Sequence, residues 1–481
     1  MGMTLVIGKP APLVSTFVDA VDEAIHDHDP GQGLSAIQRA WLAFCWTAIL
    51  VTNSICWARF ARARLGAYSL AALSWMFRHT KIPWEALLVA SVRVILRHYG
   101  LTSGSLVIDD TDQQRSTSAM TLAHLYKLRD QESGGYIWGQ SLVFLLVVTP
   151  TITIPVGFTF DKPAPELSAW SKQERKLKQR KAPTQQRPPK PPPNPQYPTT
   201  QELALRLLQQ CKDHYPDLRV HCIVADALYG ASTFVEAASA IWGGVQVISQ
   251  VRSHQKVRVY KHEPHVADYC ATHPGTPQKI RIRGGDEVVA IVGSARMYVY
   301  AHHTKRFIMA LKYEGEETYR YLMASTLCWR TLDMVQGHTL RWLVEVFVQD
   351  WKSHEGWSQL TKQPGDEGAR RSVILSLLVD HCLVFHPDQQ AQLRNNLPAY
   401  TVGSLRANVQ VECLVDVMQE LLSSTDPQGH LHRFTQALHE LCAFGRSTKH
   451  LIQRQPGHLE PLPYLKYRAH EVMRNMPVLS T

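Results

Sequence analysis

The chain has 481 residues, with 51 Lys and Arg against 41 Asp and Glu and a formal net charge of +10. Because single hydrophobic cores stop growing near ~250–300 residues, this length predicts several structural units. The basic excess favours a polyanionic partner, with nucleic acid before an acidic membrane surface. Nine cysteines without a Cys-x-x-Cys pair favour reduced thiols, so we expect a cytoplasmic protein rather than a secreted, disulfide-bonded one.

Residues 1–100 read as several helices and as a probable DNA-binding region. Between Arg59 and Arg97 there are seven Lys or Arg and only Glu85 to oppose them, which fits a DNA-binding surface as well as a solvated basic face. The uncharged run from Ala40 to Ala58 approaches the ~20 residues that span a bilayer. Its polar residues and the lack of a second such run favour a buried helix, so no membrane association is expected.

Residues 101–255 predict the first part of an α/β core. Three β-rich runs without helices between them, at 105–111, 141–149 and 151–160, indicate an antiparallel meander. The order helix, strand, helix, strand from 199 to 251 then indicates a parallel half joined to it.

Residues 161–198 within this core form a basic, Pro-rich arm that cannot build a core of its own. We expect the arm to be extended and mobile, and either to follow a phosphate backbone or to act as a passive spacer. The candidate DNA contacts in it are Lys176, Lys178, Arg180 and Lys181.

Alternating β runs predict a β-rich insertion at 256–325, before the core resumes at 326–390 and a helical region follows at 391–481. Inside the insertion, two short spacings are compatible with zinc but match no common finger register. They are formed by His262, His265, Cys270 and His273, for which exposed loop residues are the alternative to a metal site.

The stretch from Arg341 to Lys352 predicts a helix with a polar and an apolar side. At about 100° per residue, Arg341 and Lys352 fall within roughly 40° of Glu345, while Phe347 and Trp351 lie on the opposite side. One carboxylate therefore lies beside two cations.

Three acids occur at the ends of elements or on this helix: Asp110 after the first strand, Asp226 after the fourth, and Glu345. Carboxylates converging from two strands and a helix would make an all-oxygen site, which suits Mg²⁺ or Mn²⁺. Two such ions could serve the two sides of a phosphodiester. Arg341 and Lys352 would then hold nearby phosphates.

The chain resembles the DDE transposases of bacterial insertion sequences, in the family named as insertion sequence four. Their third-acid helix carries Tyr-x2-Arg-x3-Glu-x6-Lys, and this chain has His338-x2-Arg341-x3-Glu345-x6-Lys352. The strand ends 107–111 and 224–230 are similar to the first two acidic motifs of that family. The resemblance covers about residues 101–385 and implies a ribonuclease-H-like mixed sheet whose three acids bind two divalent ions.

Several expectations follow from the resemblance for single residues. Asp110 is preferred over Asp109 as the first acid because Thr111 follows it, as in the family, although the two side chains should point to opposite sheet faces. His338 would replace the tyrosine as a phosphate donor, better when protonated. Glu355 is an alternative third acid that helix geometry does not exclude, but only Glu345 has Arg and Lys at the family spacing.

The resemblance also implies cut-and-paste movement of DNA. It predicts a bacterial cytoplasmic enzyme that hydrolyses phosphodiesters at the terminal inverted repeats of an element and transfers the freed strand into target DNA, as a homodimer that holds two ends. The alternatives are a nuclease on the same core without strand transfer, and an inactive, transposase-derived DNA-binding protein.

Overall fold

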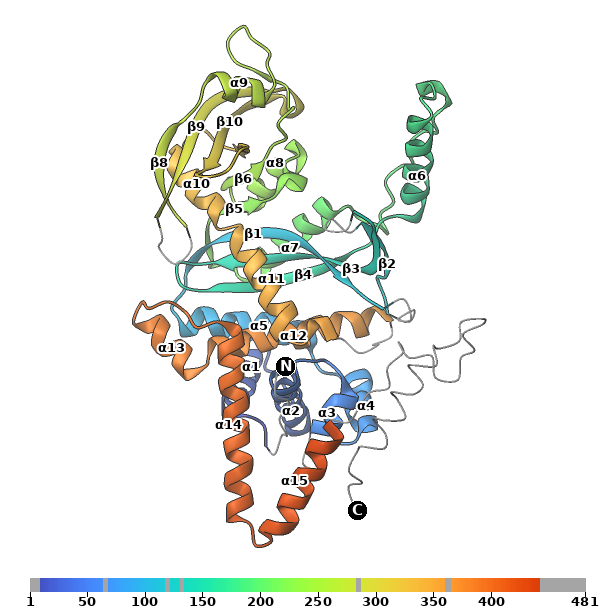
Figure 1. Ribbon diagram of the computed structural model, residues 1–481, viewed down its shortest axis with the longest axis vertical. Coiled ribbons are helices and arrows are strands. Elements are labelled where there is room, and N and C mark those ends of the chain that lie inside the picture. The colour runs from blue at the N-terminus through green and yellow to red at the C-terminus, as the bar shows by residue number, and fades with distance from the viewer. Residues whose placement is uncertain are drawn as a thin grey trace, which may run out of the picture.

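The computed structural model describes residues 9–63, 68–116, 122–129, 134–282, 287–359 and 365–441. A single mixed sheet of eleven strands runs through the upper half of the molecule, and a layer of helices lies beneath it (Figure 1). This arrangement confirms the expected α/β class.

The centre of the sheet is built around β1 (Ser103–Gln114), which pairs antiparallel with β3 (Tyr136–Val148) and parallel with β5 (Arg219–Ala225). On one side of the sheet, β3 also pairs antiparallel with β4 (Thr153–Asp161) and with the short β2 (Tyr126–Arg129). On the other side, β5 pairs parallel with β6 (Gln246–Gln250). The meander and the parallel half therefore occur as expected, although β1 and β3 are longer than their apolar runs.

The β-rich segment extends this same sheet instead of forming a separate one. Its last strand, β11 (Arg320–Ala324), pairs antiparallel with β6, and β10 (Thr304–Tyr313) pairs with β11. Beyond β10 lie β9 (Glu287–Val299), β8 (Thr276–Arg281) and the two-residue β7 (Val257–Arg258), with helix α9 (Val266–Thr272) beside them.

Alternation along β1 sends its side chains to two cores. Val107 packs in the core that contains α11 (Trp342–His354) and α12 (Gly365–Val384). Leu106 and Ile108 pack in the other core, with α7 (Thr200–His214) and α8 (Ser232–Ile241). Because successive strand residues face opposite sides, this alternation fixes where the acids that follow must point.

Helices from both ends of the chain form the layer beneath the sheet (Figure 1). They are α1 (Pro12–His28), α2 (Ala36–Thr52), α3 (Trp57–Ala63), α4 (Leu70–His79), α5 (Trp84–His98) and the later α12. The uncharged run after Ala40 falls mostly in α2, which starts at a capping box on Ser35 and is buried on all sides from Trp41 onward. Within the described residues, none of the helices combines the length and hydropathy needed to cross a bilayer.

The basic arm differs from the extended segment expected from its composition. Its first half is a helix, α6 (Pro165–Gln179), which projects from the sheet and buries none of its residues (Figure 1). A proline at the first helical position, Glu166 in the first turn and the Glu174–Lys178 ion pair all favour the helix. The chain then returns along it, where Trp170 Nε1 donates to the carbonyl of Pro188 at 2.8 Å.

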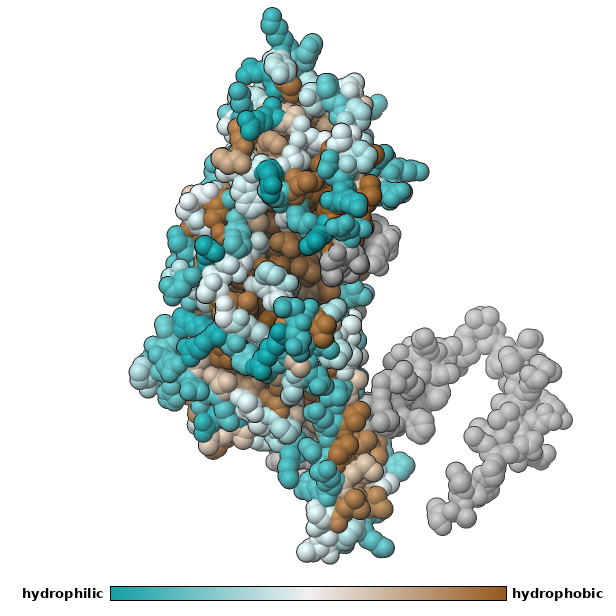
Figure 2. All heavy atoms as spheres, turned by 90° about the vertical axis from the view of Figure 1, so that its left-hand side faces the viewer, coloured by the Kyte–Doolittle hydropathy of each residue, from teal (hydrophilic) through white to brown (hydrophobic). Residues whose placement is uncertain are grey.

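The C-terminal helices are α13 (Pro387–Arg394), α14 (Val402–Ser423) and α15 (Pro427–Leu441). The last two form the lower end of the molecule, and Figure 2 shows hydrophobic side chains gathering near that end. The exposed apolar residues on these two helices are Val411, Val415, Met418, Leu422 and Leu431. The basic tail that follows lies outside the described residues.

Candidate active site

The site is organised by Arg341, which lies between α10 (Thr331–Thr339) and α11. Its Nη1 donates to Asp109 Oδ2 and its Nη2 to Glu345 Oε1, each at 2.6 Å. Glu345 lies one helical turn further along, at the i, i+4 spacing. One guanidinium fork therefore joins an acid of the central strand to an acid of the helix that packs on it.

Asp109 and Asp110 point to opposite faces of β1. Asp109 is 9% exposed and faces α11, on the same side as Val107 and Thr111. Burial raises the pKa of Asp109 to about 6, although the Arg341 charge opposes the shift. Asp109, the alternative to Asp110 as the first acid, is thus the aspartate that lies beside Glu345.

Asp110 lies on the α7 side of the sheet and is exposed as a whole residue. Desolvation of its carboxyl group, followed by the charges of Asp109 and Asp226, raises its pKa to about 7. Asp112 and Asp161 add further negative charge on its side of the strand. Among the ion pairs of the described chain, none joins Asp110 to a cation as Arg341 is joined to Asp109.

Asp226 follows β5 and lies level with Asp109. Ile108 of β1 is paired with Ala225 of the parallel strand β5, so the next residue of each strand ends at the same edge of the sheet. Asp226 Oδ1 accepts a 2.6 Å hydrogen bond from the amide of Leu228, which starts a short 3₁₀ turn (Ala227–Tyr229). The negative charge of Asp226 contributes to the raised pKa of both Asp109 and Asp110.

The donor set at this edge is chemically suited to a hard divalent ion. Asp109, Asp226 and Glu345 offer carboxylate oxygens from two strands and a helix, which is what Mg²⁺ and Mn²⁺ prefer. In the described part of the chain, however, no three acidic, His or Cys side chains are gathered closely enough to hold a metal together. Arg341 contacts one oxygen of each of two carboxylates, Asp109 Oδ2 and Glu345 Oε1.

Lys352 lies about three helical turns beyond Arg341. It is anchored on the face of β1 that carries Asp109 and Thr111. Its Nζ donates to Thr111 Oγ1 at 2.7 Å and to the carbonyl of Asp112 at 2.6 Å. Burial, together with the nearby Arg115 charge, lowers the pKa of Lys352 to about 8, while Asp112 opposes the shift. The ammonium is therefore held in place beside the acids but keeps its charge only up to mildly alkaline pH.

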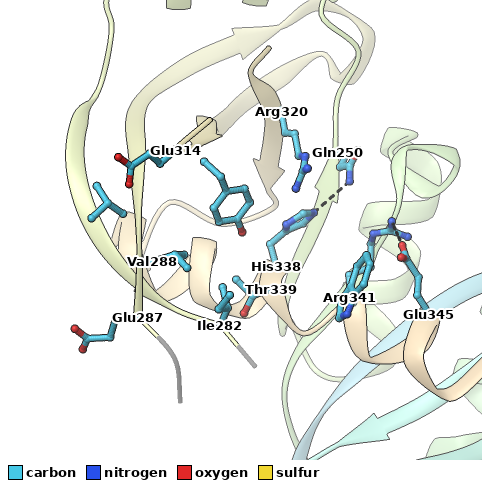
Figure 3. A pocket seen from close by; sticks show the side chains of 13 residues that line it. Gln250, Ile282, Glu287, Val288, Glu314, Arg320, His338, Thr339, Arg341 and Glu345 are labelled. Atoms are coloured by element: carbon cyan, nitrogen blue, oxygen red, sulfur yellow. Dashed lines mark hydrogen bonds and ion pairs between the residues drawn. The ribbon is translucent and has the colours of Figure 1, made fainter. Parts of the chain in front are cut away.

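His338 lies in the wall of a cavity of about 1070 Å³ between the start of α11 and the strands β9 and β10 (Figure 3). Arg341 and Glu345 line one end of this cavity. Burial, followed by the charge of Arg341, lowers the pKa of His338 to about 4, and Gln250 Nε2 lies 3.3 Å from His338 Nε2. The ring is thus neutral near pH 7, contrary to its expected use as a protonated donor.

Glu355 is fully buried at the end of α11 and does not face the other acids. Burial raises its pKa well above the usual range, and the neighbouring Asp380 of α12 raises it further. Helix spacing alone left Glu355 open as a third acid. The packing of α12 against α11 buries Glu355 beside Asp380, and Glu355 takes no part in the Arg341 fork.

The residues with zinc-like spacing do not converge. His265 Nδ1 contacts the carbonyl of His254, and the His273 ring stacks on Tyr269. Cys270 is buried on the inner side of α9. No zinc-like cluster is found among the described residues.

Sequence reasoning assigned no role to Arg115, one residue past β1. Its guanidinium is buried and stacks on the ring of Trp357, with the charge centre 4.3 Å from the ring centroid. Trp357 in turn stacks on Trp351 of α11. No sequence pattern signals this contact, because Arg115 lies 242 positions before Trp357, which begins the short 3₁₀ helix η5 (Trp357–Gln359).

The sheet order, with β1 between antiparallel β3 and parallel β5 and acids at its edge, defines a ribonuclease-H-like nuclease core. The family model described as "DDE superfamily endonuclease" matches residues 62–303, half of the chain. The chain belongs to this family. The match includes Asp109, Asp110 and Asp226, whereas Glu345 lies beyond it.

Among solved structures, the chain is similar to the cryo-EM structure of a piggyBac transposase synaptic complex with hairpin DNA. The two are 10% identical, the alignment covers 87% of this chain and 81% of that chain, and the TM-score is 0.41. A comparison with curated protein sequences finds no match. Membership of the insertion-sequence-four family remains a resemblance carried by the motif around Glu345.

Proposed function

We propose that the protein is a transposase that cuts DNA at the ends of a mobile element and joins the freed strand to target DNA. The observation that carries the proposal is the fork of Arg341, which lies 232 positions after Asp109 in the chain and joins it to Glu345. An endonuclease family match over the first two acids supports the same reading.

In this proposal, Asp109, Asp226 and Glu345 are the metal ligands, with Asp109 in place of the Asp110 favoured by the family motif. The preference for Asp109 rests on its direction, since it faces α11 whereas Asp110 faces away. Bound Mg²⁺ or Mn²⁺ ions, two in number, supply Lewis-acid activation of a water or a 3′-hydroxyl and stabilise the leaving oxygen. The carboxylates hold the ions, and the protein contributes positioning instead of a covalent intermediate.

Arg341 has two roles in this proposal. Its guanidinium bonds Asp109 and Glu345 and so offsets the repulsion between these two carboxylates. Its planar set of donors would also hold a phosphate beside the reacting bond. Lys352, already fixed by Thr111, holds a second phosphate as a point charge.

The wider DNA contacts are proposed for the arm and the cavity. The candidate contacts of the arm lie at the end of α6 and just beyond it, and they are Lys176, Lys178, Arg180 and Lys181. Helix α6 buries none of its residues and projects from the sheet. His338 is proposed to shape the cavity wall and not to donate a proton. A homodimer would hold two element ends, and the protein would act in the bacterial cytoplasm.

A cleavage and joining assay tests the function. Purified protein is incubated with Mg²⁺ or Mn²⁺ and plasmids that carry the inverted repeats flanking its coding region. Joined products support a transposase, whereas nicks alone support a nuclease without strand transfer, the alternative that the family description favours. Binding without cutting at any metal concentration would mean an inactive DNA-binding relative and would overturn the proposal.

A further inference from the structure

Arg115 is a buried cation, and its surroundings in the described structure offer hydrogen bonds but no opposite charge. The residue is 7% exposed. Its Nε donates to Gln140 Oε1 at 3.0 Å and its Nη1 to the carbonyl of Trp357 at 2.9 Å, while Nη2 has no partner among the described residues. Burial alone lowers the pKa of Arg115, to about 9, with no carboxylate acting against the shift.

Such a charge is costly to keep. Taking a cation out of water without an anionic partner costs several kcal/mol, which is why buried charges in proteins are normally paired. The ring of Trp357 offsets part of this cost through its negative face. The neutral oxygens of Gln140 and Trp357 offset another part, but neither supplies a full counter-charge.

A second cation lies beside it. Lys352 Nζ donates to Thr111 Oγ1 and to the carbonyl of Asp112, four and three residues before Arg115. Trp351, next to Lys352 in α11, stacks on the Trp357 ring that Arg115 covers, and the Arg115 charge accordingly acts to lower the pKa of Lys352. Lys352 is half buried, so its ammonium reaches the surface that Arg115 does not. Two like charges are thus held together where protein screens them poorly, and one of them faces solvent.

We infer that Arg115 is a positioning residue whose missing counter-charge is a phosphate of the DNA backbone bound at Lys352. A phosphate resting on Lys352 lies in the field of both cations. Arg115 also fixes the site mechanically, because its contacts with Trp357 tie the end of α11 to β1. This inference rests on the proposed DNA function.

The test uses the full chain and a labelled duplex of arbitrary sequence, whose binding is measured over a range of salt concentrations and pH. In the Arg115→Gln variant, which keeps an amide donor at the position of Nε but loses the charge and the donor to Trp357, we expect about tenfold weaker binding. The slope of log affinity against log salt should fall by about one. Arg115→Lys, which keeps the charge but loses the fork, should retain the wild-type slope.

The pH profile adds a readout that a purely structural role would not move. In Arg115→Gln the pKa of Lys352 rises, so the alkaline loss of binding should shift to higher pH than in the wild type. Arg394→Met on α13 removes an exposed arginine bonded only to Gln390 in the described structure, and serves as the matched control. Thermal melting of each free variant checks folding, and Arg115→Met replaces the Gln variant if that one fails to fold.

The outcomes separate this inference from the proposed function. If the wild type shows no salt-dependent binding to the duplex, the proposed function fails first. If the wild type binds and the neutral variants keep both its slope and its alkaline limb, the inference about Arg115 is wrong while the function stands. Equal loss of slope in Arg115→Lys and Arg115→Gln would likewise overturn it, because geometry and not charge would then be responsible.

Discussion

The guanidinium of Arg341 donates a 2.6 Å hydrogen bond to the carboxylate of Asp109, although 232 residues separate them in the chain. The contact exists because α11 crosses the face of the sheet to which Asp109, and not Asp110, points. It ties the sequence signature around Glu345 to Asp109, whereas the family motif favours Asp110.

The first prediction concerns these two aspartates. Asp109→Asn should reduce metal-dependent DNA nicking at least about a hundredfold, because it removes the charge of a proposed ion ligand and of the ion-pair partner of Arg341. Asp110→Asn, on the other face of β1, should retain nicking within about tenfold. Initial nicking rates with Mg²⁺ and with Mn²⁺ measure both variants. The opposite ranking would restore Asp110 as the first acid.

The second prediction compares two glutamates on one helix. Glu345→Gln should abolish cleavage while leaving DNA binding in place, because it removes a ligand and not a phosphate contact. Glu355→Gln should cleave normally, since Glu355 is buried against Asp380 and does not reach the other acids. Parallel cleavage and binding measurements decide the point, and equal loss of cleavage in both variants would contradict the assignment.

The third prediction is a pH dependence of stability from Glu355. Its pKa is raised in the folded protein above the ordinary value of 4.5, so above pH 4.5 the unfolded chain releases a proton that the native state retains. The free energy of unfolding of the wild type should therefore fall as pH rises, by up to ~1.4 kcal/mol per pH unit for this group.

Glu355→Gln does not titrate and is close in shape to the protonated acid. Its stability advantage over the wild type should be absent well below pH 4.5 and should grow as pH rises toward neutrality. Denaturant unfolding of both proteins from acid to neutral pH measures the difference. A constant difference across that range would show that Glu355 is not held protonated.

The fourth prediction concerns the arm. Replacing Lys176, Lys178, Arg180 and Lys181 together by Ala should weaken binding to duplex DNA at least about tenfold and lower the salt slope by about two to four. Melting temperature should change little, because α6 buries none of its residues. A variant with wild-type affinity would reduce the arm to a spacer, and one that unfolds would point to a structural role.

Some of this architecture is determined by the sequence itself. The apolar run before Asp109, with its strand-forming residues, specifies β1 without help from the rest of the chain. The spacing of Arg341 and Glu345 fixes their ion pair, because residues four apart meet on any α-helix. The apolar side containing Phe347 and Trp351 is buried against the sheet as its period indicates.

The helix in the arm and the partners of the β-rich strands could not be predicted from composition and strand pattern. The charge and proline content of the arm favours an extended chain, yet helix formers and a favourable N-terminus make α6. The β-rich strands alternate as expected, but nothing in their pattern shows that β11 pairs with β6 and continues the central sheet. Strand partners are chosen by packing across long separations, which a single strand does not encode.

The sequence by itself indicated the α/β class, carboxylates at strand ends and on a helix, and a resemblance to DDE enzymes. Only the tertiary structure shows that Asp109, and not Asp110, faces α11. It also shows that Glu355 is buried and that Arg115 lies beside Lys352. The physical reason is the same in each case. Periodicity determines which residues share a face, whereas desolvation and contact depend on which other element covers that face, and that element comes from a distant part of the chain.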